Sequence, residues 1–231
     1  MKTKTFVLAF IIGLFAVAVW ADAGFIGEPS TSGVPVSGGG GGATVLYVPF
    51  EGNSAKNLVD NSNPTAQGGS ITSDDKYVGT YSYDTEGSTT GLVYSISNFD
   101  PTDYEIRFAW KMPTYANGDY VFYIYVDANN YIYIGTIVNG TNLQLVHRAG
   151  GITETLDTTT TINDGAWHTI DMIVESGTVS VYIDGSGTPD ESEAIVGTWA
   201  GSVASCMWGV EYDNTSVCDC FLDDLYISAA P

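Results

Sequence analysis

The stretch Asp164-Gly-Ala-Trp-His-Thr-Ile-Asp-Met-Ile-Val-Glu-Ser-Gly-Thr-Val-Ser-Val-Tyr-Ile-Asp-Gly185 decides how this 231-residue chain folds. Apolar residues alternate with polar ones on either side of residues 175–178: Ile170, Met172 and Val174 before them, and Val179, Val181 and Ile183 after them. Successive side chains of a strand point to opposite faces, so each set lies on one face of a strand. Residues 175–178 are polar and contain a glycine, as a tight turn requires. The stretch predicts a β-hairpin, closed by a second turn at Asp184-Gly185, with Trp167 covering the end of a core.

The rest of the chain repeats this pattern of short apolar runs separated by turn residues. Aromatic residues make up 13% of the chain, and its 27 glycines supply turns. Strands are predicted at residues 45–50, 76–83, 91–97, 104–111, 120–126, 131–138, 143–148, 152–156, 199–212 and 217–227. Their spacing of about 8–12 residues is typical of antiparallel sandwiches. We therefore expect an all-β fold of two packed sheets.

The N-terminal 43 residues indicate an exported protein, with one domain after them. Residues 1–23 combine Lys2 and Lys4 with an apolar run and an Ala-Asp-Ala cleavage pattern, which indicates a signal peptide. Residues 24–43, with five consecutive glycines, read as a flexible linker. The domain is then expected at residues 44–231. We expect a secreted or cell-surface protein, with membrane contact only if the leader is retained.

Charge and cysteines narrow the possible partners. A formal charge of −20 disfavours nucleic acid, whose phosphates would be repelled. The acidic excess serves either solubility or the binding of calcium. Three cysteines, Cys206, Cys218 and Cys220, lie near the C-terminus. In an oxidising compartment Cys206 could pair with Cys218 or with Cys220, leaving one thiol free.

The most aromatic segment is a second predicted hairpin, residues 120–138. In one register, one face carries Tyr123, Tyr125, Tyr131 and Tyr133, whereas a slip of one residue would place Tyr131 and Tyr133 with Phe122 and Ile124. The loop between the strands supplies Asp127, Asn129 and Asn130. Rings that stack on sugar C–H faces, beside polar groups for hydroxyls, are typical of carbohydrate sites. The alternative is that these tyrosines belong to the core.

Four segments together resemble the LamG-like, concanavalin A-type jelly roll. They are Val-Leu-Tyr-Val-Pro-Phe-Glu-Gly at 45–52, Asp-Lys-Tyr-Val-Gly-Thr-Tyr-Ser-Tyr-Asp at 75–84, the hairpin from Trp167, and Phe-Leu-Asp-Asp-Leu-Tyr-Ile at 221–227. They follow the family's order and span residues 45–228. Tyr81-Ser82 departs from the family's Ala-Leu at this place. The resemblance implies that the first and last strands are neighbours in one sheet.

That neighbourhood motivates a calcium hypothesis. Related sandwiches often carry a structural calcium near their joined ends, and Ca²⁺ prefers carboxylate and carbonyl oxygens. Here Glu51, Asn53 and Asp223 would contribute oxygens. The alternative is that they are solvated side chains beside turns.

The family includes both glucanases and lectins, so fold alone does not decide function. The E-x-D-x-x-E and E-x-D-x-E strand motifs of the laminarinase-type enzymes do not occur in this chain, and His168 belongs to the Trp-His pattern of the scaffold. We therefore expect no enzyme activity. A carbohydrate-binding module fits best, and an adhesive cell-surface or virion protein that binds another protein is the alternative.

Overall fold

The computed structural model describes residues 43–112, 119–136, 141–213, 216 and 218–229. The predicted signal peptide and residues 24–42 of the predicted linker lie outside this range. Among the described residues, no helix is long and apolar enough to cross a membrane. The described chain folds into strands alone, as expected for an all-β protein.

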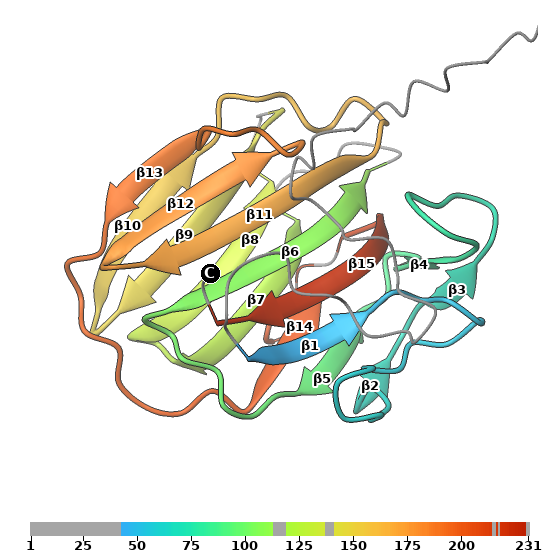
Figure 1. The fold of residues 1–231 in the computed structure, drawn as a ribbon, viewed down its shortest axis with the longest axis horizontal. Coiled ribbons are helices and arrows are strands. Elements are labelled where there is room, and N and C mark those ends of the chain that lie inside the picture. Colours follow the sequence, from blue (N-terminus) through green and yellow to red (C-terminus); the bar gives the residue numbers. More distant parts are fainter. Residues whose placement is uncertain (1–42, 113–118, 137–140, 214–215, 217, 230–231) are drawn as a thin grey trace, which may run out of the picture.

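Two antiparallel sheets lie face to face (Figure 1). In sheet A the strands run in the order β13 (Glu191–Ala194), β12 (Thr178–Ile183), β11 (His168–Glu175), β6 (Tyr104–Lys111), β15 (Phe221–Ser228), β4 (Ser82–Asp84) and β3 (Ser70–Thr72), and β1 (Thr44–Val48) also pairs with β15. In sheet B the order is β10 (Ile152–Asp157), β9 (Leu143–Ala149), β8 (Asn130–Thr136), β7 (Tyr120–Asp127), β14 (Ser205–Trp208), β5 (Leu92–Ser95) and β2 (Ala66–Gln67). The predicted two-sheet jelly-roll sandwich is confirmed.

The hairpin predicted from residues 164–185 forms as β11 and β12. Met172 pairs with Val181 in the ladder, and the apolar set on each strand faces the core. Ser176 and Gly177 connect the strands with φ of 51° and 76°. Positive φ at both turn residues matches the right-handed twist of a two-residue hairpin. Asp184 and Gly185 also have positive φ and form the second turn.

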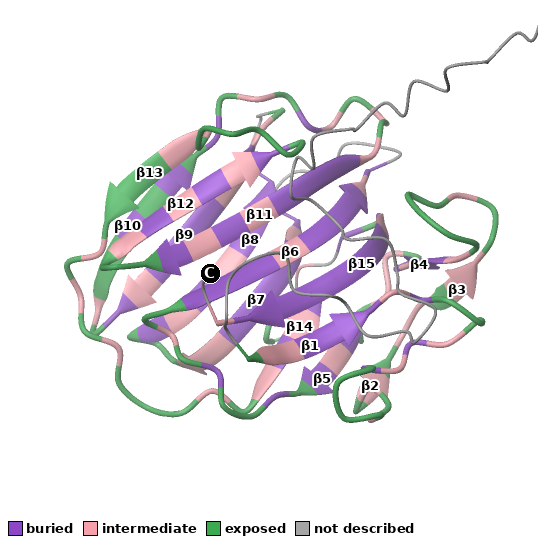
Figure 2. Cartoon of the chain, in the orientation of Figure 1, coloured by how far each residue is buried: buried purple, intermediate pink, exposed green. Residues whose placement is uncertain are grey.

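The core is built from large rings that meet between the sheets. Trp208 of sheet B packs against Phe108 of sheet A and against Phe122 of its own sheet, with ring centroids 5.1 and 4.5 Å apart. Tyr104, Ile106, Phe108 and Trp110 alternate along β6, which forms where a strand was predicted, and all are fully buried. Figure 2 shows that β6 and β15 are almost entirely buried, whereas the edge strand β13 is exposed.

Strand β15 joins the end of the domain to its beginning. It pairs with β1, where Val48 lies opposite Leu225, and on its other side with β6. The first and last strands are therefore neighbours, as the family resemblance implied. The ladder to β6 is irregular between Asp223 and Tyr226, and Asp224 has a φ of 53°.

Three segments differ from their predicted structure. Residues 76–81 form a loop rather than a strand, because Gly79 has a φ of 67° and acidic side chains bind the loop amides. Residues 191–194, expected in a loop, form edge strand β13, and β2 and β3 lie within another expected loop. These strands are very short, or they pair with a strand that is distant in sequence. Local periodicity does not detect strands of either kind.

Trp167, predicted to cover the end of a core, lies between a loop and sheet A. Its indole Nε1 donates to Asp75 Oδ1 at 2.8 Å, and its ring packs against Tyr77 and Phe221. Lys111 Nζ donates to the second oxygen of the same Asp75 carboxylate at 2.6 Å. Trp167 therefore fixes the loop that follows Asp75 to sheet A.

The cysteines Cys206, Cys218 and Cys220 are buried and free, so the disulfide predicted from the sequence is not formed in this structure. Burial raises the pKa of the Cys206 thiol to about 12. A thiol held protonated and away from solvent is a poor nucleophile.

We expect all three thiols to resist an alkylating reagent in the native protein and to react once guanidinium unfolds it. The reason is complete burial, and intact-mass spectrometry without reductant counts the labels. A single label after unfolding would contradict the structure and establish the disulfide.

Candidate functional site

The predicted tyrosine hairpin adopts the first of the two registers. In the β7–β8 ladder Tyr123 lies opposite Tyr133, and Tyr125 lies opposite Tyr131. The alternating residues Phe122, Ile124, Ile132 and Ile134 are fully buried in the core. The tyrosines consequently share the outer face of sheet B, and the slipped register is excluded.

Two more tyrosines extend this cluster. Tyr212, which follows β14, stacks on Tyr125 with centroids 4.0 Å apart and planes 6° apart. Tyr120 meets Tyr133 edge-on at 5.0 Å. We call the resulting surface, Tyr120, Tyr123, Tyr125, Tyr131, Tyr133 and Tyr212, the tyrosine face. Its rings support one another, because stacked and edge-to-face arrangements are both favourable.

The rings of the tyrosine face differ in exposure. Tyr123, Tyr131 and Tyr133 lie with planes 12–25° apart and ring centroids 5.9–6.2 Å apart. The residue Tyr212 is 41% exposed, whereas the other five tyrosines are buried or half-buried. Burial raises the pKa of Tyr123 and of Tyr133, so both hydroxyls remain protonated donors at neutral pH. The surface offers one accessible ring beside a band of phenol groups.

Polar side chains border the tyrosine face along β9. Tyr133 donates its hydroxyl to Gln144 Oε1 at 2.8 Å, and Gln144 Nε2 donates to Asp157 Oδ1 at 2.9 Å. The Arg148 guanidinium lies 5.8 Å from the centre of the Tyr131 ring, within cation–π range. These contacts orient the hydroxyls and the ring edges on this side of the face.

The predicted loop residues divide into two groups. Asp127 and Asn129 are exposed, and Asp127 Oδ1 accepts from Asn129 N and from Asn130 Nδ2. Asn130 is only 3% exposed, and its Oδ1 accepts from the amides of Gly150 and Ala200. Asn130 therefore ties the hairpin to two neighbouring turns and does not offer its side chain at the surface.

Tyr212 was missed by reasoning from the sequence. It belongs to no alternating run, and it reaches Tyr125 only because β14 pairs with β7, placing Trp208 opposite Phe122. That pairing joins residues about 85 positions apart, which local periodicity does not predict. The local signal was only its position as the last residue of the strand predicted at residues 199–212.

The second predicted site, the acidic junction, is a loop anchor in the structure. Asp223 is fully buried, and its Oδ2 accepts from Tyr77 N and Val78 N at 3.2 and 3.1 Å. Its Oδ1 accepts from Asp224 N at 2.8 Å. Burial, the largest cause, raises the pKa of Asp223 to about 7, although these amide bonds oppose the shift.

Glu51 binds the same loop from the other side, and Asn53 faces elsewhere. Glu51 Oε1 accepts from Thr80 N at 2.8 Å, whereas Asn53 lines a groove at the edge of the sandwich. Among the described residues, no cluster of acidic, histidine or cysteine side chains has the arrangement of a metal site. Calcium binding by Glu51, Asn53 and Asp223 is therefore still a prediction.

His168 has a structural environment, as expected of the Trp-His pattern. Its Nδ1 lies 2.9 Å from Asp184 Oδ2 and its Nε2 lies 3.1 Å from Asp164 Oδ1. Burial alone would lower the pKa of His168, but the hydrogen bonds to both carboxylates outweigh it and the pKa is raised. The ring thereby joins the segments that enter and leave the β11–β12 hairpin at its open end, opposite the Ser176–Gly177 turn.

The model of the concanavalin A-like lectin/glucanase superfamily matches residues 87–230. The chain therefore belongs to this superfamily. A search of curated proteins gave no match.

Solved structures with a similar fold include proteins that bind or process carbohydrate. Domain 4 of AbnA, a GH43 extracellular arabinanase from Geobacillus stearothermophilus solved with arabinotriose, has a TM-score of 0.65 at 19% identity over 82% of this chain and 93% of that one. A carbohydrate esterase from Shiga toxin-encoding bacteriophage phi24B has a TM-score of 0.56 and 18% sequence identity. The match covers 83% of this chain and 100% of the esterase chain.

The binding domain of botulinum neurotoxin serotype D has a TM-score of 0.60 and 14% sequence identity. The match covers 81% of this chain but only 48% of the neurotoxin chain. At these identities all three structures support the fold alone.

The raised pKa of Asp223 predicts how stability depends on pH. The folded chain holds the Asp223 proton more tightly than the unfolded chain, whose aspartate titrates near 3.8. This contribution is full below about pH 4 and is lost as pH rises through about 7. We expect the free energy of unfolding to fall by on the order of a few kcal/mol between pH 5 and pH 8.5.

Urea unfolding across this range, in EDTA, measures the change. Asp223→Asn keeps an oxygen for the loop amides and should reduce the slope, whereas Glu193→Gln, on exposed β13, should leave it unchanged. Burial also raises the pKa of Asp171 to about 7, so part of the slope persists in the variant. An unaltered slope in Asp223→Asn would contradict the assignment.

Proposed function

We propose that this domain is a non-catalytic carbohydrate-binding module of a secreted or cell-surface protein. The observation that carries the proposal is the exposed Tyr212 ring, stacked on Tyr125 beside a band of phenol hydroxyls. The apolar face of a sugar ring packs on an aromatic face, while its hydroxyls need donors and acceptors nearby. The tyrosine face supplies both over one sheet.

The support of Tyr212 from beneath makes the surface suitable for a ligand. Tyr125 holds the Tyr212 ring parallel to its own, and Tyr123 contacts both rings. A ring already held in place loses little freedom when a sugar binds, so less of the binding free energy is spent on ordering it. Along the same face the Tyr133 hydroxyl is oriented by Gln144.

Charge favours a neutral glycan. The chain carries a formal charge of −20, which repels sulfated and uronic acid polymers as it repels nucleic acid. Arg148 is the nearby cation on the tyrosine face, and its guanidinium is also bound to Thr153. The similar structure of AbnA domain 4 was solved with arabinotriose, a neutral oligosaccharide, which makes such oligosaccharides the first probes.

We propose absence of catalysis because the chain lacks the paired-carboxylate strand motif of the glucanases in its superfamily. Retaining glycosidases place two carboxyl groups about 5–5.5 Å apart across the scissile bond. Release of reducing sugar from β-glucan or arabinan by the purified protein would overturn this part of the proposal.

The alternative partner is a protein. The binding domain of botulinum neurotoxin DC, with a TM-score of 0.60, was solved with rat synaptotagmin II. An exposed aromatic surface also suits a protein partner, since tyrosine is common in interface centres. Silence toward all glycans together with specific capture of one surface protein would favour this function.

The central prediction concerns Tyr212. Replacing Tyr212 with Ala removes the accessible ring but no core contact, and we expect glycan affinity to fall by about tenfold or more, or about 1.4 kcal/mol. Glycan-array screening followed by calorimetry on the hit measures this. Tyr182→Ala, a half-buried tyrosine on sheet A, is the matched control and should bind as the wild type does. Equal affinity in both variants would exclude the tyrosine face.

Calcium binding by Glu51, Asn53 and Asp223 stays a prediction. A bound ion would have to replace amide bonds of Asp223 and hold its carboxylate ionised. If the ion is present, EDTA lowers the melting temperature of the wild type but not of Asp223→Asn. A melting temperature unaffected by EDTA leaves loop anchoring as the role of Asp223.

A further inference from the structure

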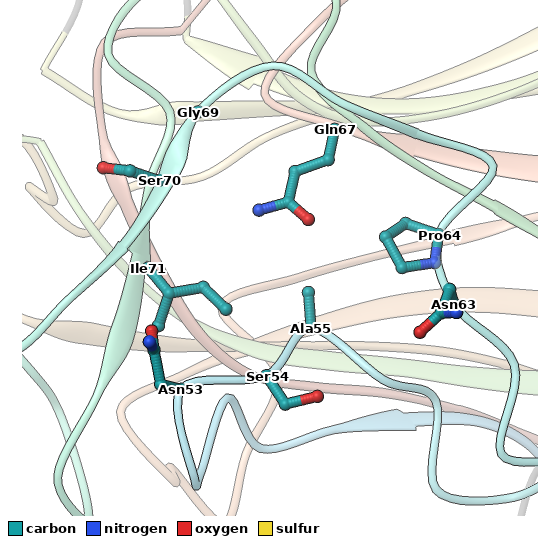
Figure 3. A pocket seen from close by; sticks show the side chains of 9 residues that line it. All are labelled: Asn53, Ser54, Ala55, Asn63, Pro64, Gln67, Gly69, Ser70 and Ile71. Carbon is teal, nitrogen blue, oxygen red and sulfur yellow. The ribbon is translucent and has the colours of Figure 1, made fainter.

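A groove opens at the edge of the sandwich, away from the tyrosine face. Its volume is about 560 Å³, within the roughly 300–1,000 Å³ of small-molecule sites. The turn after β1, the loop before β2, and strands β2 and β3 form its walls (Figure 3). Strands β14 and β5 separate β2 from β7 in sheet B, so the groove and the tyrosine face are distinct surfaces.

Carboxamides line this groove from three separate segments. Asn53, Asn63 and Gln67 border it, and Figure 3 shows the Gln67 amide reaching into its centre. Among the described residues none of these side-chain amides has a hydrogen-bond partner, whereas Ser54 and Ser70 on the same walls are bonded within the protein. A carboxamide both donates and accepts, as does a sugar hydroxyl.

Apolar groups complete the lining. The Ala55 methyl points toward the Gln67 amide, and the Pro64 ring and the Ile71 side chain lie on opposite sides of the groove (Figure 3). This combination of a small apolar surface with a few convergent polar groups is typical of sites for small polar ligands. The C–H groups of a sugar ring can contact Pro64 and Ile71 while its hydroxyls meet the amides.

The lining carries no charged side chain. A divalent cation would need carboxylates, and an anion would need a cation or a helix terminus to offset the overall negative charge. The groove therefore selects for neutral, hydroxyl-rich ligands.

The groove is held in shape by bonds to the sandwich. The buried Tyr94 donates its hydroxyl to Ala55 O at 2.6 Å, and Gly69 N donates to the Tyr83 hydroxyl at 2.8 Å. Thr65 N and Gly68 N donate to Val93 O and Gly91 O at 2.7 and 2.8 Å. Each wall is thereby fixed to β4, to β5 or to the residue preceding β5. A site prepared in this way spends little free energy on ordering itself when it binds.

We propose that this amide groove binds a neutral sugar residue and acts as a second carbohydrate site, independent of the tyrosine face. Asn53, Asn63 and Gln67 provide the hydrogen bonds, and Pro64 and Ile71 provide the apolar contact. Two sites on one domain would let it engage a branched or repetitive glycan at two points, which raises avidity without new contacts.

Nitrogen-15 NMR of the full chain tests the site directly, because side-chain amides give separate signals. The probes are arabinotriose, maltotriose, cellotriose and laminaritriose, titrated into the wild type and into Tyr212→Ala. We expect at least one probe to shift the amide signals of Asn53, Asn63 and Gln67 saturably and equally in both proteins. The combined variant Asn53→Gly, Asn63→Ala and Gln67→Leu should weaken this binding by about tenfold or more.

The variants are chosen to fold. Asn53 has a φ of 56°, which glycine adopts without strain, and leucine preserves the bulk of Gln67 on the edge strand. Asn163→Ala, outside the groove, is the control and should bind normally. Groove signals unmoved by every probe, or moved only when Tyr212 is intact, would overturn the second site. If a probe no longer binds the tyrosine face of Tyr212→Ala but still shifts the groove signals, the result concerns the tyrosine face alone and the second site stands.

Discussion

The buried carboxylate of Asp223 is the interaction on which the arrangement of sheet A depends. It lies on β15, between β1 and β6, and binds the amides of Tyr77 and Val78. The same loop carries Asp75, which holds Trp167 and Lys111. One loop thus gathers the first strand, the last strand and the central hairpin. The four segments that resemble the family are therefore the segments that meet at this loop.

The proposed binding surface, the tyrosine face, lies on sheet B and results from a simpler constraint, the alternation of side chains along a strand. Because side chains alternate along β7 and β8, burying Phe122 and Ile124 in the core forces Tyr123 and Tyr125 outward. The core thus determines the chemistry of the surface. The other tyrosines of the face are buried or half-buried, so the Tyr212 ring is the most accessible of them. In the proposed function, recognition rests on one stacking contact and several hydrogen bonds.

Period-two patterning predicted the regular strands well, because burial on one face leaves a local signature. Strand β6 was predicted with the bounds it has, and the β11–β12 hairpin with its turn. Features that depend on distant contacts were not predicted. The loop at residues 76–81 has a strand-like sequence, yet carboxylates from β15 and from the turn after β1 bind its amides. The position of Tyr212 and the amide groove depend on the pairing of strands that are far apart in sequence. Asn130 belongs to a polar loop sequence typical of the surface, yet its side chain is buried.

Glycan recognition by the tyrosine face is tested most directly by NMR of the protein with isotope-labelled tyrosine rings. On titration with a glycan identified by array screening, we expect the ring signals of Tyr212, Tyr125 and Tyr131 to shift together with one saturation curve. The ring signal of Tyr182, on the opposite sheet, should stay unchanged. Binding that shifts Tyr182 and leaves the Tyr212 and Tyr125 rings unperturbed would contradict recognition by the tyrosine face.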